Sequence, residues 1–394
     1  MNCGRVQNGE INLMHLVWGL GTGGMENTLI NVCNRLPRGE FAPSICVFES
    51  GGPMESRVDA ERVELIHVRR HFGNDPTLPL RLARELRRRR IHILQTNMWA
   101  TLIEGIVAAK LARVPMLIHE EHGTIETCRR RVVAQRWGWG RADQVVAVSA
   151  ALADRMTDVV GFPRDGIHVI NNSVDTERFR PSGVPRCELR RQLHLPPNGL
   201  LIGMVARFVG FKNHAGVLDA VAKLRAVGIQ TELVLVGSGP LRGELAQLAN
   251  TLRIADCVHF LGELDGVERL LHALDVFVSN SSHNEGLSLS LLEAMACEVP
   301  VVATRVAGHP DVLDEGRAGV LIPPQDTGAL MGALRQLALD PALRSSLGGA
   351  GRRRVVDHYA ASSMVEAYRQ LYTRLARSPG NSPACKRKTW GLRF

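Results

Sequence analysis

The sequence is poor in aromatic residues, in paired cysteines and in long apolar runs, and each shortage excludes a class of protein. Aromatic residues make up 5% of the 394 residues, so the stacking platforms that hold single-stranded nucleic acid are scarce. No apolar run approaches the roughly 18 residues that a membrane-spanning helix needs. The eight cysteines are scattered without a C-x-x-C pair, which is typical of reduced thiols rather than of disulfides or a zinc site. We therefore expect a cytoplasmic protein, long enough to form two domains.

Acidic residues are scarce in one part of the chain, which makes the net charge of +9 uneven. Between Arg69 and Arg141 there are 15 Lys and Arg residues against 6 Asp and Glu, and the tail from Arg377 adds five basic residues and no acidic one. Such a charge run is most often a solvated face. Nucleic acid is not expected as a partner, because zinc-finger spacing is absent and aromatic residues are few. The more specific interpretation is peripheral contact of Arg69–Arg141 with anionic lipid or with a phosphate-bearing acceptor.

The segment CRRRVVAQRWGWGR, which ends at Arg141, combines five arginines with Val132, Val133, Trp137 and Trp139. Tryptophan beside arginine suits a membrane interface, where the rings lie at headgroup depth and the guanidinium groups bind phosphate. A solvated helix with two core-facing tryptophans explains the same pattern equally well. Both interpretations therefore stay open at the level of the sequence.

Strand-like and helix-like segments alternate along the whole chain, which predicts α/β layers built on parallel sheets. The pattern falls into two similar sets, so we expect two Rossmann-like domains. The first is expected over 1–180 and the second over 199–361, with a polar, proline-bearing linker at 181–198. A final helix is expected at 362–377, followed by a disordered basic tail at 378–394.

The stretch SSHNEGLSLSLLEAMACEVPVVAT, residues 281–304, is the most informative in the chain. Its apolar spacing predicts a loop followed by a helix over Leu287–Cys297. Glu285 then precedes the helix, and Glu293 lies one or two turns inside it. Gly286 and the serines after it leave backbone N–H groups available at the helix start, which suits the diphosphate of a nucleotide-sugar. One carboxylate can hold sugar hydroxyls and the other a ribose, although two solvated glutamates explain the spacing alone.

Two basic residues lie near the start of the second domain. The strand LLIGMVAR ends at Arg207, and Lys212 follows five residues later, at the opening of the next helix. Together the two cations can neutralise a diphosphate leaving group, because arginine offers a planar fork and lysine a point charge. On an unliganded surface loop the same pair would have no function. Further along, Gly237 and Gly239 are expected to shape a turn, and the backbone near Leu261 is a candidate for holding a nucleotide base.

A glycine-rich loop follows the first strand of the chain. Gly19, Gly21 and Gly24 satisfy G-x-G-x-x-G between a strand and a helix. Glu49 ends the next strand, where a ribose-binding acid lies in dinucleotide-binding proteins. An NAD-dependent oxidoreductase is therefore an alternative from a different class. The motif does not decide between them, because a tight turn near any phosphate needs the same glycines.

The glutamate block closely resembles the E-x7-E signature of retaining family 4 glycosyltransferases, and the resemblance extends from Asn12 to about Leu375. Gly23–Glu26, the R-x4-K pair and the G-x-G-P turn are similar to other loops of that family. There are departures. Glu298 stands where the family usually has glycine, and Thr96–Trp99 lies where it often has histidine, which puts acceptor specificity in doubt. Within the family, GGMENTLINVCNRLP with EEHGT is most similar to the sugar transferases of bacterial exopolysaccharide and exosortase (PEP-CTERM) systems.

The sequence HEEHGT at residues 119–124 ends a strand of the first domain. Its histidines stand three residues apart rather than in H-E-x-x-H, and no third ligand is evident, so a zinc site is not expected. His122 followed by Gly123 resembles the family's acceptor-side histidine. His119 would then be the supporting or buried one.

The resemblance implies a GT-B architecture, with two Rossmann-like domains facing across a cleft and the final helix crossing back onto the first domain. It also implies retaining, metal-independent transfer of a hexosyl group from a UDP- or GDP-linked donor to a glycan or lipid-linked acceptor. No D-x-D motif occurs in the sequence, and no cofactor is expected. Retention is expected by attack on the face from which the diphosphate leaves, because no nucleophile for double displacement is evident.

The resemblance also implies roles for single residues. Glu285 would orient the donor sugar, and Glu293 would bind the ribose. Arg207 and Lys212 would neutralise the diphosphate, with His122 on the acceptor side. The further donor-binding residues implied are Gly23, Gly24, Leu261, Gly286, Leu287, Ser288 and Leu289.

Three alternatives stay open. An NAD-dependent oxidoreductase would bind a dinucleotide. A nucleotide-sugar epimerase can share the two-domain fold, and would interconvert sugars without an acceptor. A non-catalytic module would bind the donor and never turn it over. The donor base, the sugar and the acceptor are not specified by the sequence.

Overall fold

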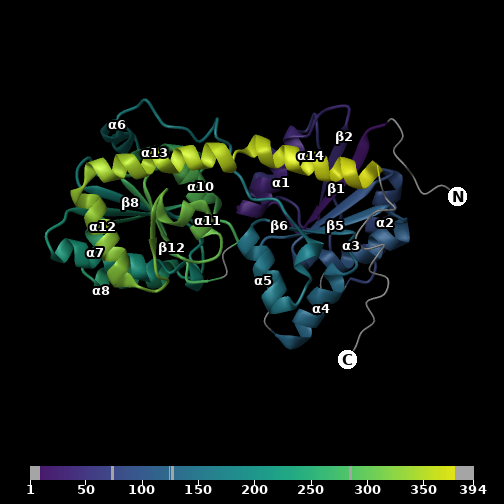
Figure 1. The fold of residues 1–394 in the computed structure, drawn as a ribbon, viewed down its shortest axis with the longest axis horizontal. Helices are drawn as coiled ribbons and strands as arrows, with labels where there is room; N and C mark the ends of the chain where they lie inside the picture. Colours follow the sequence, from purple (N-terminus) through teal and green to yellow (C-terminus); the bar gives the residue numbers. More distant parts are fainter. Residues whose placement is uncertain (1–8, 72–74, 124, 126–127, 284–285, 378–394) are drawn as a thin grey trace. The chain divides into compact units, whose positions relative to one another are not determined.

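The computed structural model describes residues 9–71, 75–123, 125, 128–283 and 286–377, which form two compact α/β units (Figure 1). The first unit comprises the chain up to Asn172 together with the chain from Ser362 onward, and the second comprises Ser173–Ala361. Each unit is built on one parallel sheet, so the prediction of two Rossmann-like domains is confirmed. The tail expected at 378–394 lies outside the described residues.

The first unit contains a seven-stranded parallel sheet in the order β3-β2-β1-β4-β5-β6-β7. Its strands are β1 (Ile11–Val17), β2 (Phe41–Val47), β3 (Glu64–His67), β4 (Ile93–Asn97), β5 (Met116–Glu121), β6 (Gln144–Ala147) and β7 (Ile167–Val169). Its helices are α1 (Gly24–Arg35), α2 (Leu78–Arg88), α3 (Trp99–Ala112), α4 (Arg129–Trp139), α5 (Ala150–Val160) and α14 (Ala361–Arg377), with 3₁₀ turns at Pro53–Arg57 and Arg164–Gly166. The central strands are buried on both faces because helices cover both.

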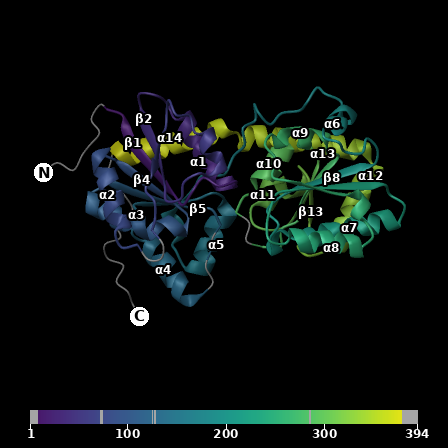
Figure 2. The ribbon, with the colours of Figure 1, turned by 180° about the vertical axis from the view of Figure 1, so that it is seen from behind.

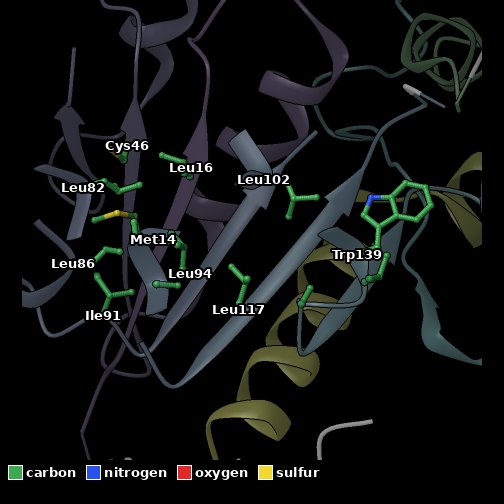
Figure 3. Close-up of a cluster of buried hydrophobic side chains, with 14 of the residues drawn as sticks. Met14, Leu16, Cys46, Leu82, Leu86, Ile91, Leu94, Leu102, Leu117 and Trp139 are labelled. Atoms are coloured by element: carbon green, nitrogen blue, oxygen red, sulfur yellow. The ribbon is translucent and has the colours of Figure 1, made fainter. Parts of the chain in front are cut away.

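Helices α2, α3, α4 and α5 pack on one face of this sheet, as Figure 1 shows. Figure 3 shows Leu82 and Leu86 of α2 in one cluster with Met14 of β1 and Leu94 of β4. Helices α1 and α14 pack on the other face. Burying both faces in this way removes a continuous apolar surface from water, which is the main favourable contribution to the stability of such a sheet.

Helix α14 belongs to the first unit because of its apolar spacing. Tyr368, Leu371, Tyr372 and Leu375 recur at helical intervals and are buried in the same cluster as Leu13 of β1. A helix with one such stripe must cover an apolar surface. The prediction that the final helix crosses back onto the first domain is therefore confirmed.

The second unit contains a six-stranded parallel sheet in the order β10-β9-β8-β11-β12-β13. Its strands are β8 (Leu200–Val205), β9 (Thr231–Val236), β10 (Val258–Gly262), β11 (Val276–Ser279), β12 (Val301–Thr304) and β13 (Val320–Ile322). Its helices are α6 (Arg186–Gln192), α7 (His214–Ala226), α8 (Arg242–Thr251), α9 (Val267–Ala273), α10 (Leu289–Ala296), α11 (His309–Val312), α12 (Thr327–Leu339) and α13 (Pro341–His358), with 3₁₀ turns at Gly210–Lys212, Ala255–Cys257 and Asp314–Gly316. Helices α7, α8 and α12 cover one face, and α9, α10 and α13 cover the other (Figure 2).

The segment 181–198, which we expected to be a linker, is instead part of the second unit. It contains α6, and Leu189 and Leu195 are buried in the core formed by α9 and α10. Arg190 is also buried, and its guanidinium group donates to Asp275 at 2.6 Å. The first domain also ends earlier than the expected residue 180, because Ser173 already belongs to the second unit. Four charged residues and four prolines make this segment look like a linker in the sequence, although two of its leucines are buried.

Candidate functional site

In the second unit, the order of the strands reverses between β8 and β11. Strands β9 and β10 lie on one side of this point, and β12 and β13 lie on the other. In open parallel sheets the loops that leave the carboxyl ends of two such strands diverge and leave room for a ligand. The two loops here carry the basic pair that follows β8 and the glycine- and serine-containing segment that follows β11.

The loop after β8 carries Arg207 and Lys212. Arg207 is exposed and Lys212 is half-buried, with its ammonium group 5.5 Å from the centre of the Phe211 ring. Lys212 ends a 3₁₀ turn, and the side chain of Asn213 caps α7 by accepting from the backbone N–H of Gly216 at 3.3 Å. The structure therefore presents both predicted cations on one short loop, as the sequence pattern requires.

Hydrogen bonds connect this loop to the chain after β11. The backbone N–H of Ser282 donates to the Phe211 carbonyl at 2.7 Å, and the Asn280 side chain donates to the Asn213 carbonyl at 3.0 Å. Thr304, at the end of β12, donates to the Ser281 carbonyl at 2.6 Å. These hydrogen bonds join the loop after β8, the segment after β11 and the end of β12. They therefore fix the spacing between the basic loop and the segment that leads to α10.

Helix α10 begins at Leu289, and Ser288 is its N-cap residue. The first N–H groups of a helix have no partner within it, and the Ser288 side chain makes no capping hydrogen bond among the described residues. Gly286 and Leu287 are buried immediately before it. The structure therefore places a helix start where the sequence predicts one, and its binding of a diphosphate stays a prediction.

Of the two signature glutamates, only Glu293 lies within the described residues. Glu293 is half-buried in α10, five residues into the helix. Glu285 lies outside the described residues, so its expected contact with the donor sugar stays a prediction.

The glycines after β9 shape a turn. A side chain at Gly237 would place its Cβ 2.2 Å from the Ala206 carbonyl oxygen, and one at Gly239 would place it 2.6 Å from that of Phe208. Both glycines have positive φ angles. They therefore allow the chain after β9 to approach the loop after β8 closely. Leu261, the candidate for the base, is half-buried in β10.

In the first unit the strand order reverses between β1 and β4. Gly23 is the N-cap residue of α1 and Gly24 is its first residue, so the predicted glycine loop lies at the second switch point. The carboxylate of Glu49 accepts from the indole N–H of Trp18 at 3.0 Å. Glu49, the residue that would bind a ribose in a dinucleotide-binding protein, therefore accepts a hydrogen bond from another side chain of the protein.

His122 follows β5, at the carboxyl edge of the same sheet. Its backbone N–H and that of Gly123 both donate to the Glu121 carboxylate at 3.1 Å, which fixes the turn. The imidazole is 8% exposed, and burial lowers its pKa to about 3, so the ring is neutral at physiological pH. His119 lies in the core, bonded to Thr96 at 2.9 Å and stacked on Trp139.

Sequence reasoning missed Glu120, whose partners are Gln95 and Tyr368. Burial raises the pKa of Glu120 to about 7. Two glutamates follow His119 in β5, and the sequence does not show which of them is buried. It also does not show that Glu120 accepts a hydrogen bond from Tyr368 of α14. Asn213 and Ser282 were also missed, because their role depends on loops from two strands.

The basic helix α4 has a mixed surface. Val133 is 58% exposed and Trp137 is 45% exposed, beside the exposed Arg129–Arg131. Trp139 is fully buried, with its ring edge against Phe162. Neither interpretation of the sequence therefore holds for both tryptophans: Trp139 faces the core, as a core-facing helix requires, whereas Trp137 is exposed, as an interfacial helix requires.

The described residues contain neither a cluster of metal-ligating side chains nor a helix that could span a membrane. No group of three or more His, Cys, Asp or Glu side chains is placed to hold a metal ion there. None of the helices in the described part of the chain has the length and apolar character needed to cross a membrane.

Two family profiles match the chain, one for each half. Residues 22–178 match the profile described as Glycosyltransferase Family 4, and residues 185–354 match Glycosyl transferases group 1. Together they span most of both units, and the second includes β8, β11 and the loops that follow these strands.

Curated relatives fall in the same group of enzymes. The chain is 30% identical to D-inositol 3-phosphate glycosyltransferase of Saccharomonospora viridis, over 71% of this chain and 69% of that protein. It is 30% identical to N-acetyl-alpha-D-glucosaminyl L-malate synthase of Bacillus anthracis, over 62% of this chain and 63% of that protein. It is 27% identical to the lipopolysaccharide core biosynthesis glycosyltransferase LpsE of Rhizobium meliloti, over 89% of this chain and 95% of that protein.

Solved structures share the fold. HepE of Anabaena, solved in complex with UDP and glucose, superposes with a TM-score of 0.82 at 20% identity, over 93% of this chain and all of that one. At this identity the likeness concerns the fold, which is the GT-B fold of two Rossmann-like domains.

Proposed function

Because the chain belongs to the family 4 and group 1 glycosyltransferases, we propose that it transfers a sugar from a UDP- or GDP-linked donor to a glycan or lipid-linked acceptor. One observation carries this proposal. Arg207 and Lys212 follow β8, and the start of α10 lies beyond β11, at the point where the strand order of the second unit reverses. Cations and a helix N-terminus at such a point suit a diphosphate.

In the proposed reaction, negative charge develops on the diphosphate as the bond to the sugar breaks. Arg207 and Lys212 stabilise this charge from one side, and the first turn of α10 from the other. Groups already in place for a charge that grows in the transition state lower the barrier. Glu293 binds the ribose hydroxyls, and Glu285 orients the donor sugar.

We propose that the transfer retains the anomeric configuration and needs no metal ion. The bond from C1 of the sugar to the diphosphate oxygen breaks, and a bond from C1 to the acceptor hydroxyl oxygen forms on the same face. The proton of that hydroxyl moves to the leaving phosphate, so no protein nucleophile is required. The two cations supply positive charge at the diphosphate.

The experiment that tests the proposal has two steps. Thermal stabilisation by a panel of UDP- and GDP-sugars identifies the donor, because a ligand that binds only the folded state raises the melting temperature. Release of nucleoside diphosphate is then measured with and without candidate acceptors, and the anomeric configuration of the product is read by NMR. No stabilisation by any nucleotide-sugar would contradict the proposal.

The same assays separate the alternatives. A nucleotide-sugar epimerase would interconvert sugars without an acceptor, and a binding module would stabilise with the donor but release no product. An NAD-dependent oxidoreductase is not supported, because both family matches are to glycosyltransferases.

We propose a role in bacterial exopolysaccharide or other cell-surface polysaccharide synthesis, including the exosortase (PEP-CTERM) type. Relatives named as LpsE and as a putative glycosyltransferase, EpsF of Bacillus subtilis, support this setting. The enzyme would work in the cytoplasm, in peripheral contact with the inner face of the membrane through the basic surface that includes α4.

A further inference from the structure

A buried polar network joins helix α14 to the sheet of the first unit. The Tyr368 hydroxyl donates to one oxygen of the Glu120 carboxyl group, and the Gln95 amide donates to the other. The Tyr372 hydroxyl donates to the Gln95 amide oxygen at 2.8 Å. All four side chains lie in the interior, where a hydrogen-bonded group is held in one orientation.

The imidazole of His122 lies next to this network. Its Nε2 atom lies 3.5 Å from the Glu120 oxygen that accepts from Tyr368. Neither ring nitrogen of His122 has a hydrogen-bond partner among the described residues, although both are buried. Among the described residues, Glu120 therefore has the carboxyl group that lies closest to the Nε2 atom of His122.

The chemistry of a neutral imidazole makes this neighbour important. Such a ring has one N–H donor and one acceptor nitrogen, and the hydrogen bond at one nitrogen decides which is which. A Glu120 carboxylate accepts from an N–H at Nε2. The Nδ1 atom, which is buried without a partner among the described residues, is then the acceptor nitrogen that the proposal assigns to a substrate hydroxyl group.

We propose that Glu120, held by Tyr368 and Gln95, is a positioning residue that sets the tautomer of His122, so that helix α14 controls the acceptor-side histidine. This inference rests on the proposed transferase function, since it assigns His122 to the substrate. It adds residues from the far end of the chain to a site that the motifs place near residue 122.

Glu120 is the member of this group that titrates near neutral pH. Burial raises its pKa to about 7, against the lowering effect of the hydrogen bonds from Tyr368 and Gln95. The pKa of His122 is lowered to about 3, so that ring stays neutral. The titratable groups that face Glu120 or His122 from the surrounding elements are His15 of β1, Cys33 of α1, His119 and Glu121 of β5, and Tyr368 and Tyr372 of α14.

The sign of the pH dependence follows from these contacts. Above about pH 7 the carboxylate form of Glu120 predominates, and in the proposed arrangement it accepts the Nε2–H of His122. Below this pH the carboxyl group is protonated. Tyr368→Phe removes a hydrogen bond that favours the carboxylate. The pKa of Glu120, and with it the pH midpoint for the His122 tautomer, should therefore rise by about one unit.

The test is NMR of the full chain carrying ¹⁵N-labelled histidine, with the His122 signals assigned through His122→Gln. We expect the ratio of the two His122 tautomers to change with a midpoint near pH 7. The midpoint should be higher in Tyr368→Phe and absent in Glu120→Gln. Tyr372→Phe is the matched control, because this hydroxyl bonds Gln95 rather than Glu120, and its shift should be smaller.

The NMR titrations and the transfer assay test the positioning role of Glu120 and the proposed function separately. If folded Tyr368→Phe and Glu120→Gln both show the His122 titration of the parent, the positioning role is wrong. In the transfer assay, the midpoint of kcat should move as the NMR midpoint moves, with an unchanged KM for the donor. Since the NMR measurement needs no turnover, the expected NMR shifts in a chain that transfers no sugar would contradict the proposed function while supporting the network.

Discussion

Arg207 and Lys212 are the two residues whose loss should affect sugar transfer most. If they stabilise charge on the departing diphosphate, Arg207→Ala and Lys212→Ala should each lower kcat by about 100-fold. Both fall on the loop after β8, outside the hydrophobic core, so the melting temperature should change little. Lys223→Ala is the control, because Lys223 is an exposed cation on α7 that pairs only with Asp219 in the described contacts. Equal kcat in all three folded variants would remove the diphosphate assignment.

The two signature glutamates should separate by what they bind. Glu293→Ala should weaken binding of free UDP or GDP by roughly 10- to 100-fold, since it removes a charged hydrogen-bonding partner of the ribose. Glu285→Ala should leave nucleotide affinity nearly unchanged and depress transfer, because its expected partner is the sugar. Calorimetry with the nucleotide alone measures this difference. The same loss of affinity in both variants would contradict the separate roles.

At the residue scale, short motifs predicted the candidate site only in part. Arg207, Lys212 and His122 could be found because each stands at a fixed distance from a strand end, and a loop after a strand keeps that geometry. The partner of Glu120 could not be found, because Tyr368 lies 248 residues away in the sequence. Only the packing of α14 on the sheet brings the two together.

At the scale of elements, helix α6 gives a clear test of the fold. Arg190 is buried and bonded to Asp275, and it also donates to the Ala273 carbonyl at 3.0 Å. Arg190→Ala leaves the buried Asp275 without this charge partner, so the free energy of unfolding should fall by about 3–5 kcal/mol. Urea denaturation followed by circular dichroism measures the change. Arg191→Ala is the matched control, because Arg191 is exposed. An equal, small loss in both variants would show that α6 does not stabilise the second unit.

Helix α4 should contribute to membrane binding through its exposed arginines. Each basic residue near an anionic surface adds about 1 kcal/mol, so binding should be reversible and weakened by salt. We expect the parent to sediment with anionic vesicles and not with neutral ones. Replacing Arg129–Arg131 by Ala should reduce recovery, whereas removing three exposed cations of the second unit should not.

The control variant replaces Lys223, Arg335 and Arg353 by Ala, which are exposed in the second unit. Equal recovery of both triple variants would mean that net charge, not α4, attracts the chain. No sedimentation of the parent would leave α4 as a solvated helix.

The positions of helices and strands were predicted better than the packing of their side chains. The central strands follow from apolar runs that are buried on both faces, so their positions could be read from the sequence. Trp139 could not be assigned to the core or the surface from the pattern around it, because arginines surround both it and Trp137. In the structure Trp139 packs against Phe162 and Trp137 lies beside Arg141.

At the scale of the whole molecule, alternating strands and helices were enough to predict two Rossmann-like domains. The boundary between the two domains could not be predicted in the same way. Composition shows how polar a segment is, but it does not show which hydrophobic core the segment packs against. The segment at 181–198 contains four charged residues and four prolines, yet two leucines and one buried ion pair attach it to the second unit. A boundary is set by such contacts between distant residues, which composition does not reveal.

The most direct test of the central claim, that the second unit binds the diphosphate of a nucleotide-sugar at the reversal between β8 and β11, is calorimetry with UDP, GDP and NAD. The parent chain should bind UDP or GDP and should not bind NAD. The double variant Arg207→Ala, Lys212→Ala should lose at least about 100-fold in affinity for the same nucleotide. Unchanged affinity in the folded double variant, or binding of NAD in preference to both nucleoside diphosphates, would contradict the claim.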